Sequence, residues 1–268
     1  MTDFNALLQG PDTTVMASVF NPISVAMASE LGFQAAMVGG SVIAANHMAM
    51  PDYGLMTLSE LVDNVRRIAS VASIPIVVDG DSGYGNTHNC WRLVRELEAA
   101  GSSAVTIEDY VLPRPAGKRH ELCDLQEQLD RLRAALEARS SGHFGVIART
   151  RVGGNVSFDE CLRRVAGYAS LPVAAVCVFG QLHPRQAAQL AQACGKPLML
   201  INYQQQRSEI PALACAGVRL LLSGHQAFEQ SLMAMYQSYA SSQGIVLSES
   251  SGRAAVRQFA AYRYPIPG

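Results

Sequence analysis

The sequence has very little lysine. Its 268 residues include only two lysines, Lys118 and Lys196, against nineteen arginines. Enzymes that work through a Schiff base or pyridoxal phosphate need a buried lysine amine. Lys118 lies in a segment rich in proline and glycine, and Lys196 directly precedes an apolar run, at the start of a predicted strand. Neither position suits that role, so the sequence disfavours covalent amine chemistry.

Paired cysteines are also absent. The six cysteines lie at least 16 residues apart, and no C-x-x-C pair occurs. This spacing argues against a structural zinc cage or a redox-active dithiol. We expect most of the cysteines to be small core residues. Cys123 is the exception, because it lies in a polar stretch.

The chain carries no block of basic residues and no long apolar run. Its formal net charge is −1, from 21 basic and 22 acidic residues, which disfavours a nucleic-acid partner or an anionic membrane surface. The longest apolar run, at residues 171–179, is much shorter than the roughly 20 residues that a membrane helix needs. Residues 1–12 include acids and no basic segment typical of a secretory signal. We therefore expect a cytoplasmic protein with no membrane partner.

Apolar residues make up 49% of the chain and charged residues 16%, and the apolar residues follow a regular alternation. Short β-rich runs alternate with longer segments of helical period. The predicted strands are residues 15–18, 35–38, 76–79, 104–108, 145–149, 173–178, 198–202 and 218–223. The predicted helices are residues 22–31, 58–70, 87–100, 125–138, 158–169, 184–193, 209–216 and 226–240.

These eight strand–helix units follow one another without a linker or a change in composition. Strands that alternate with helices form parallel sheets, and eight such units that close on themselves make an α/β fold, the (β/α)8 TIM-type barrel. An open doubly wound sheet is the alternative. We assign residues 1–241 to a barrel that forms one catalytic domain. Residues 242–268 are assigned to a C-terminal helical arm, with a short helix near residues 253–261.

Polar residues recur where the predicted strands end. These segments are Gly-Gly-Ser at 39–41, Asp-Gly-Asp at 79–81, Glu-Asp at 108–109, Arg-Thr at 149–150, Asn-Tyr at 202–203 and Ser-Gly-His at 223–225. The C-terminal ends of the strands are where TIM barrels place their active sites. Strands often end where polarity begins, so one segment alone is weak. The set as a whole predicts an active site at this end.

Three carboxylates, Asp79, Asp81 and Glu108, come from adjacent predicted strands. Side chains alternate along a strand, so Asp79 and Asp81 can point the same way. Converging carboxylates repel one another unless a cation is present. Oxygen ligands without cysteine or histidine favour Mg²⁺ or Mn²⁺ over Zn²⁺. The alternative is that these acids cap helices, for example Asp81 before the helix predicted from residue 87.

Three further segments have two interpretations each. Gly40 and Ser41 belong to a turn that either holds a carboxylate or phosphate through its N–H groups and hydroxyl or is only a tight turn. Arg149 ends an apolar strand and needs an anionic partner, which is a substrate oxygen, Glu108, or both. His225 precedes the last predicted helix, either as an acid–base group or as a cap.

The segment V-D-G-D-S-G-Y-G-N at residues 78–86 resembles the metal-binding signature of the isocitrate lyase / phosphoenolpyruvate mutase superfamily. Other segments agree with it. Residues 39–41 resemble the family's carboxylate-binding turn, 51–52 its second acid, 107–109 its next metal-shell carboxylate and 148–150 its catalytic arginine. The resemblance extends from about residue 17 to residue 236.

Within this superfamily the sequence most resembles the oxaloacetate decarboxylase branch, through A-S-V-F at 17–20, L-M-L at 198–200 and G-H at 224–225. In that branch the positions that match Arg149, Tyr203 and His225 line the substrate pocket. The loop at 112–123 has neither the Cys-Gly-His of the true lyases nor the Lys-Thr-Asn of the phosphonomutases. Arg151 is a departure, because the superfamily usually has a polar or acidic residue there.

The resemblance implies Mg²⁺-dependent decarboxylation of oxaloacetate, or a similar small 2-oxo acid, to pyruvate and CO2 through an enolate. Mn²⁺ is the possible substitute ion. The implied metal residues are Asp79, which binds the ion directly, and Asp81, Glu108 and Asp52, which act through waters. The implied substrate-binding residues are Gly40, Ser41, Arg149, Tyr203 and His225, and the last three are also the implied catalytic residues.

Other functions remain open at this point. A carbon–carbon lyase acting on a substituted malate or a 2-methylisocitrate-like substrate would use Cys123 or Glu121 as its acid. Carbon–phosphorus chemistry on phosphonopyruvate or phosphoenolpyruvate is another alternative, and a barrel with a lapsed site serving as an assembly subunit is a third. The resemblance further implies a homotetramer, often a dimer of dimers that exchange a C-terminal helix, and a lid at residues 112–123.

Overall fold

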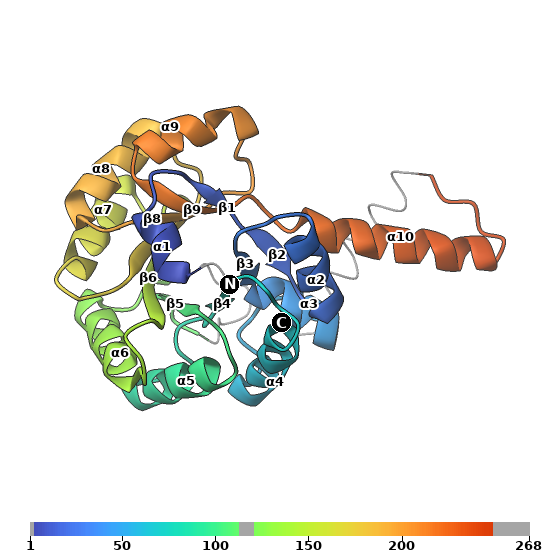
Figure 1. The fold of residues 1–268 in the computed structure, drawn as a ribbon, viewed down its shortest axis with the longest axis horizontal. Helices are drawn as coiled ribbons and strands as arrows, with labels where there is room; N and C mark the ends of the chain where they lie inside the picture. The colour runs from blue at the N-terminus through green and yellow to red at the C-terminus, as the bar shows by residue number, and fades with distance from the viewer. Residues whose placement is uncertain (1–2, 113–120, 249–268) are drawn as a thin grey trace.

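Parallel strands at the centre of the molecule form one sheet that winds into a barrel (Figure 1). The computed structural model describes residues 3–112 and 121–248. The strands are β1 (Thr14–Val15), β2 (Ala17–Val19), β3 (Ala36–Val38), β4 (Ile76–Asp79), β5 (Ala104–Glu108), β6 (Gly145–Arg151), β7 (Ala175–Phe179), β8 (Leu198–Ile201) and β9 (Val218–Leu222). Every neighbouring pair is parallel.

The barrel closes through its first strand segment. β1 and β2 are separated only by Met16, so they act as one interrupted strand. β1 pairs with β9, with Thr14 opposite Leu220, whereas β2 pairs with β3, with Ala17 opposite Ala36. Both edges of the sheet are therefore joined through residues 14–19. This closure confirms the (β/α)8 barrel and rules out the open doubly wound sheet.

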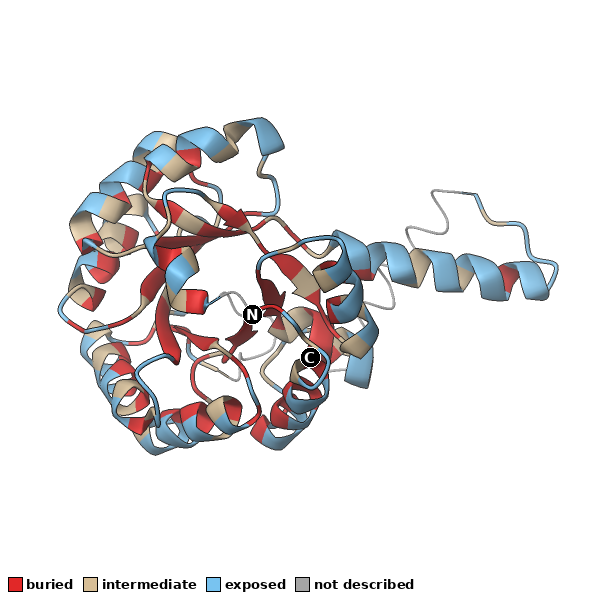
Figure 2. Cartoon of the chain, viewed as in Figure 1, coloured by how far each residue is buried: buried red, intermediate tan, exposed pale blue. Residues whose placement is uncertain are grey.

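The helices mostly surround the barrel and turn one face to it, except the last one, which extends away (Figures 1 and 2). They are α1 (Phe4–Gln9), α2 (Pro22–Glu30), α3 (Gly40–Met48), α4 (Leu58–Ala69), α5 (Thr87–Ala99), α6 (Leu125–Ala138), α7 (Phe158–Tyr168), α8 (Pro184–Cys194), α9 (Ile210–Cys215) and α10 (Gln226–Ser242), with a short 3-10 turn η1 (Arg207–Glu209) before α9. None of the helices in the described ranges is both long and apolar enough to cross a lipid bilayer.

The eight predicted strands and eight predicted helices are confirmed, with boundaries that differ by a few residues. Helix starts use the local chemistry that the sequence indicates. The Thr57 hydroxyl accepts from the N–H of Glu60, whose carboxylate accepts from the N–H of Thr57 in return. Two helices, α1 and α3, are absent from the predicted list. The helix expected near residues 253–261 lies outside the described residues, and the boundary of the arm at residue 242 stays a prediction.

The last helix, α10, leaves the barrel and extends away from it (Figure 1). Only Phe228 and Ala240 are buried among its residues, so most of its surface is exposed (Figure 2). Phe228, near its start, packs edge-on against Phe20, with ring centroids 5.0 Å apart. This contact fixes the beginning of the helix on the barrel.

The interior of the barrel is filled by apolar side chains, and α1 closes one end of it. Phe4 and Leu8 on α1 are 3% and 6% exposed and belong to the same cluster as the inward-facing strand residues. A Cβ on Gly145 would lie 2.7 Å from the Phe4 ring and 3.0 Å from the Ala104 side chain, so glycine lets the ring approach β6. Helix α1 thus seals the end of the barrel where β6 begins.

We expect Phe4→Ala to lower the free energy of unfolding by about 3–5 kcal/mol. Removal of the buried ring would leave a cavity that the surrounding side chains cannot fill. Gln9→Ala on the exposed side of α1 is the control and should change stability by less than about 0.5 kcal/mol. Urea unfolding followed by circular dichroism measures both. Equal stabilities of the two variants would show that α1 does not seal the core.

Candidate active site

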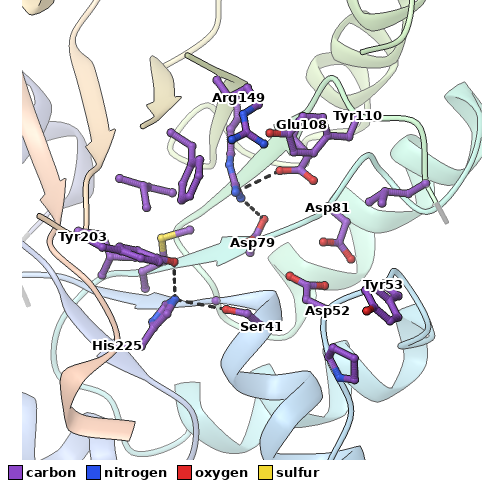
Figure 3. Close-up of a pocket in the computed structure, with 18 residues that line it drawn as sticks. Ser41, Asp52, Tyr53, Asp79, Asp81, Glu108, Tyr110, Arg149, Tyr203 and His225 are labelled. Carbon is purple, nitrogen blue, oxygen red and sulfur yellow. Dashed lines mark hydrogen bonds and ion pairs between the residues drawn. The ribbon is translucent and has the colours of Figure 1, made fainter. Parts of the chain in front are cut away.

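A cavity of about 380 Å³ opens at the C-terminal ends of the strands (Figure 3). It is lined by residues from most of the strand ends and by the 51–53 loop. The lining residues are Met37, Gly39, Ser41, Pro51, Asp52, Tyr53, Asp79, Asp81, Glu108, Tyr110, Leu112, Arg149, Arg151, Phe179, Ile201, Tyr203, Leu222 and His225. The polar strand ends that the sequence predicts as a site therefore meet in one place.

A buried ion group stands on one side of this cavity. Nη1 of Arg149 lies 2.7 Å from Oδ1 of Asp79, and Nη2 lies 3.1 Å from Oε2 of Glu108 (Figure 3). The register of the sheet places Glu108 directly opposite Arg149. The two interpretations of Arg149 are compatible, because its salt bridge to Glu108 leaves the guanidinium on the cavity wall.

More carboxylates gather than Arg149 can neutralise. A Cβ built on Gly40 would lie 3.3 Å from Oδ1 of Asp81, 3.5 Å from Oδ2 of Asp52 and 3.7 Å from Oδ2 of Asp79. Three aspartates thus converge on a backbone that has no side chain to fill the space. Figure 3 shows Asp52 and Asp81 facing one another. With Glu108, the site holds four acids.

Burial and mutual repulsion work against ionisation of these acids. Burial raises the pKa of Asp81 well above its usual range, and the charges of Asp52, Asp79 and Glu108 add to the effect. Burial also raises the pKa of Glu108 to about 8, although Arg149 beside it acts in the opposite direction. A divalent cation would remove this conflict by favouring the ionised forms.

The donor set suits Mg²⁺ held mostly through water. Across the described residues, no three His, Cys, Asp or Glu side chains form a ready-made metal-binding group. Mg²⁺ usually keeps several waters and takes only one or two carboxylates directly. The carboxylates of Asp52, Asp79 and Asp81 close to Gly40, with Glu108 beside them, are oxygen ligands of the kind that Mg²⁺ prefers. The alternative of helix capping is wrong for Asp81, because Asn86 caps α5.

A second group of polar side chains stands on the opposite wall. Nε2 of His225 lies 2.7 Å from the hydroxyl of Tyr203 and 3.3 Å from that of Ser41, and Nδ1 lies 2.6 Å from the hydroxyl of Ser18 (Figure 3 labels all but Ser18). His225 occupies the N-cap position of α10 without a side-chain bond to the helix. Its imidazole therefore serves the cavity and not the helix.

This second group is uncharged near neutral pH. Burial lowers the pKa of His225 to about 4, although Asp79 acts in the opposite direction. Burial raises the pKa of Tyr203 to about 12, against the effect of Arg149. A neutral imidazole between hydroxyl groups can pass a proton without leaving a fixed charge. The cavity thus has an ionic wall and a neutral, hydrogen-bonding wall.

The structure brings the nine predicted site residues together, with one difference in detail. Gly40 is not among the residues that line the cavity. Its N–H instead donates a hydrogen bond to Oδ2 of Asp79, 3.4 Å away, and holds that carboxylate in place. Its neighbours Gly39 and Ser41 form the wall instead. Gly39 allows His225 to approach, since a Cβ there would lie 3.0 Å from the imidazole.

Two polar residues near the predicted site belong to the scaffold. Oδ2 of Asp109 accepts hydrogen bonds from Arg164 at 3.0 Å and from Tyr168 at 2.7 Å, all three being buried. Cys123 is buried, its sulfur lies 3.7 Å from Nη1 of Arg131, and burial raises its pKa to about 11. The thiol suggested as a replacement acid is not among the lining residues, and neither is Glu121.

Sequence reasoning missed several members of the site, among them Ser18, Tyr110 and Phe179. Ser18 lies within a predicted strand, where nothing marks its hydroxyl as the partner of a residue 207 positions away. Phe179 ends an apolar run and Tyr110 follows a predicted strand end, and the sequence analysis singled out neither of them. Their place on the cavity wall follows from the strand ends that carry them. Arg151 also lines the cavity, and the sequence does single it out, because the superfamily usually has a polar or acidic residue at this position.

Fold and site together define a (β/α)8 barrel with an acid-rich active-site cavity at the C-terminal ends of its strands. The family model described as phosphoenolpyruvate phosphomutase matches residues 4–242, and the chain belongs to this family. An oxaloacetate decarboxylase of Chromohalobacter salexigens is 39% identical over 249 residues, which is 92% of this chain and 86% of the relative.

Solved structures show the same fold. The crystal structure of phosphoenolpyruvate phosphomutase from Streptomyces platensis subsp. rosaceus superposes with a TM-score of 0.81 at 27% identity, covering 95% of this chain and 94% of that one. An oxaloacetate acetylhydrolase in complex with 3,3-difluorooxalacetate superposes with a TM-score of 0.80 at 23% identity, over 96% and 92% of the two chains.

We expect the ring of His225 to stay neutral at pH 6 and to titrate near pH 4, below the ordinary value of 6.5. Nitrogen-15 NMR of histidine-labelled protein measures this, with assignment by His225→Gln and exposed His88 as the comparison within the same spectrum. Because the unfolded chain binds this proton more readily, the free energy of unfolding should fall as pH is lowered from 6.5 toward 4. A charged His225 at pH 6 would contradict the neutral wall.

Proposed function

We propose that the chain is a lyase that decarboxylates oxaloacetate, or a closely similar 2-oxo acid, to pyruvate and CO2 with Mg²⁺ as cofactor. The observation that carries the proposal is the Arg149 guanidinium held between Asp79 and Glu108 on the wall of a cavity that also holds Asp52 and Asp81. The similarity to decarboxylases over most of the chain supports it.

The ionic wall would receive the 2-oxo end of the substrate. Asp79 would hold Mg²⁺ directly, and Asp52, Asp81 and Glu108 would bind its waters. When bound, Mg²⁺ would act as a Lewis acid toward the oxygen at C2 of the substrate. Ser41, whose hydroxyl lines the cavity, would hold the C1 carboxylate, with Gly40 keeping Asp79 in position.

Arg149 supplies fixed positive charge where negative charge develops. When the C3–C4 bond breaks, its electron pair moves toward C2 and onto the carbonyl oxygen as CO2 leaves, which makes an enolate. Arg149 cannot lose its proton, because Asp79 and Glu108 raise its pKa against the effect of burial. A guanidinium that is already oriented costs little to reorganise during the reaction. No base is needed for this bond to break, in agreement with the absence of cysteine from the lining residues in the described part of the chain.

The neutral wall would complete the reaction by returning a proton to C3. The hydroxyl of Tyr203 lies 2.7 Å from Nε2 of His225 and is the proton donor. In the tautomer with its hydrogen on Nε2, His225 returns a proton to the Tyr203 oxygen while its Nδ1 takes one from the Ser18 hydroxyl, which solvent then restores. Ser18 holds the imidazole from its other side, at 2.6 Å, and thereby orients the ring. The product is pyruvate, and the proton comes from solvent through this chain of hydroxyl and imidazole groups.

We expect purified protein with Mg²⁺ to release pyruvate from oxaloacetate faster than Mg²⁺ alone does. The release above the spontaneous rate should stop when a chelator is added.

Arg149→Gln should lower kcat by about 10²–10³-fold. Asp79→Asn should lose both activity and calorimetric Mg²⁺ binding, whereas Asp63→Asn on the exposed face of α4 should keep both. Rates equal to the spontaneous one would eliminate the decarboxylase, and unchanged Mg²⁺ binding by Asp79→Asn would eliminate the metal assignment.

Carbon–phosphorus chemistry is the second candidate, because the family's own description is a phosphomutase. The Lys-Thr-Asn of the phosphonomutases is missing from this sequence, which favours the decarboxylase. Phosphonopyruvate tests this alternative directly, since a mutase would convert it to phosphoenolpyruvate, as phosphorus NMR would show. The carbon–carbon lyase is less supported, because the buried Cys123 does not reach the cavity.

The chain is further proposed to assemble as a homo-oligomer, a tetramer by family resemblance. Helices α2 and α10 expose apolar side chains beside one another: Ile23, Met27 and Leu31 are 65%, 59% and 78% exposed, and Met235 is 45% exposed. These residues line an apolar hollow of about 660 Å³ between the two helices. Exposed apolar surface of this kind typically marks an interface.

We expect light scattering after size exclusion to give the mass of a tetramer for the natural chain. Met27→Glu, which places a charge on the apolar hollow, should yield smaller species. Val71→Glu makes the same chemical change at a residue that is 50% exposed beyond the end of α4, and should leave the mass unchanged. A monomer of the natural chain at micromolar concentration would rule out the assembly.

A further inference from the structure

A second arginine, Arg151, lies in the active-site cavity and has no role in the reaction described above. It is the last residue of β6, two positions beyond Arg149. Side chains alternate along a strand, so both arginines point to the same side, and Arg151 lies about 7 Å farther toward the open end. Both line the cavity. The cavity therefore has one cation deep among the carboxylates and one nearer its mouth.

Aromatic rings hold the Arg151 guanidinium. Its central carbon lies 5.5 Å from the ring centre of Phe179 and 5.7 Å from that of Tyr110. The Phe179 ring also lies 5.9 Å from the central carbon of Arg149, so the same ring contacts both cations. Cation–π contacts of this kind orient a guanidinium without neutralising its charge. Arg151 is thus positioned, and it remains a full cation.

The charge of Arg151 lacks a carboxylate partner in the described part of the chain. None of the ion pairs there includes Arg151, although Arg149 next to it has two acidic partners. Its Nε atom is buried and makes no hydrogen bond in the described structure. Arg151 as a whole is half-buried, and a guanidinium partly shielded from water is stabilised by an anionic partner. A cavity wall that presents an oriented guanidinium without its own acid is suited to an anion from outside.

We infer that Arg151 is a specificity-determining residue, which binds the second carboxylate of the substrate and so selects 2-oxo dicarboxylates over 2-oxo monocarboxylates. The inference rests on the proposed function only in that the 2-oxo end lies beside Asp79 and Arg149. A substrate so placed extends along the Phe179 wall toward Arg151. Arginine is suited to this role because its planar fork can bind both oxygens of a carboxylate.

Loss of Arg149 and loss of Arg151 should affect different kinetic constants. Arg149 acts on charge that develops during bond breaking, so its loss lowers kcat. Arg151 binds the carboxylate that leaves as neutral CO2, so its contact is strongest in the ground state and weakens as the bond breaks. Its loss should raise KM for oxaloacetate without lowering kcat.

Binding of two matched ligands tests the inference without any turnover. Malate and 2-hydroxybutyrate have the same chain length and the same C2 hydroxyl, but only malate carries a carboxylate at C4, and neither has the 2-oxo group that decarboxylation needs. Calorimetry in the presence of Mg²⁺ would give both dissociation constants for the natural chain, Arg151→Gln and Arg151→Lys. Arg66→Gln, an exposed arginine on α4 whose side chain is 59% exposed, is the matched control.

The natural chain and Arg66→Gln should prefer malate by at least tenfold. In Arg151→Gln the preference should fall to less than threefold through weaker malate binding, with 2-hydroxybutyrate unaffected, and Arg151→Lys should retain part of it. An unchanged preference in Arg151→Gln, or equal binding of the two ligands by the natural chain, would overturn the inference. Because these constants do not depend on catalysis, the inference can fail while the decarboxylase holds, and the reverse is also true.

Discussion

The contact of Arg149 with Asp79 and Glu108 is the interaction on which the site depends. Three charged groups, each about nine-tenths removed from water, come from the ends of three neighbouring strands. Burying such charges is costly unless each has a partner at hydrogen-bond distance. The parallel register meets this condition by setting Glu108 opposite Arg149, with Asp79 on the next strand. With Asp52 and Asp81 added, the acids outnumber the single cation among them, and this excess of negative charge supports the proposed cation site.

In the proposed decarboxylation the two walls of the cavity have different roles. The ionic wall would hold fixed charge, which requires rigid side chains, and the strand ends and the Gly40 N–H hold them. The neutral wall would move a proton, which requires groups that exchange one without acquiring a lasting charge. Burial serves both purposes, because it strengthens the ionic contacts and keeps the His225 ring neutral. Phe179 contacts a member of each wall, because its ring centre lies 5.9 Å from the central guanidinium carbon of Arg149 and 5.6 Å from the ring centre of Tyr203.

Local patterns predicted the elements well because the chain meets simple requirements at short range. Each strand is a short apolar run, and helix starts such as Thr57 with Glu60 carry their own capping groups. Helix α1 was not predicted, since its two buried residues, Phe4 and Leu8, have meaning only against the inward faces of distant strands. The polar stretch around Cys123 suggested an accessible thiol for a related reason. In the folded chain this cysteine is buried against Arg131, a contact that its sequence neighbours do not reveal.

The sequence by itself determined the alternation of strands and helices, the polar residues at the strand ends and the identity of the acids and of Arg149. These follow from periodicity and residue chemistry, which are local properties. Tertiary structure alone decided that the sheet closes through residues 14–19, that Ser18 meets His225, and that Arg151 contacts two aromatic rings and forms no ion pair within residues 3–112 and 121–248. Such facts depend on which strand lies beside which, and a barrel brings together residues that no local pattern connects.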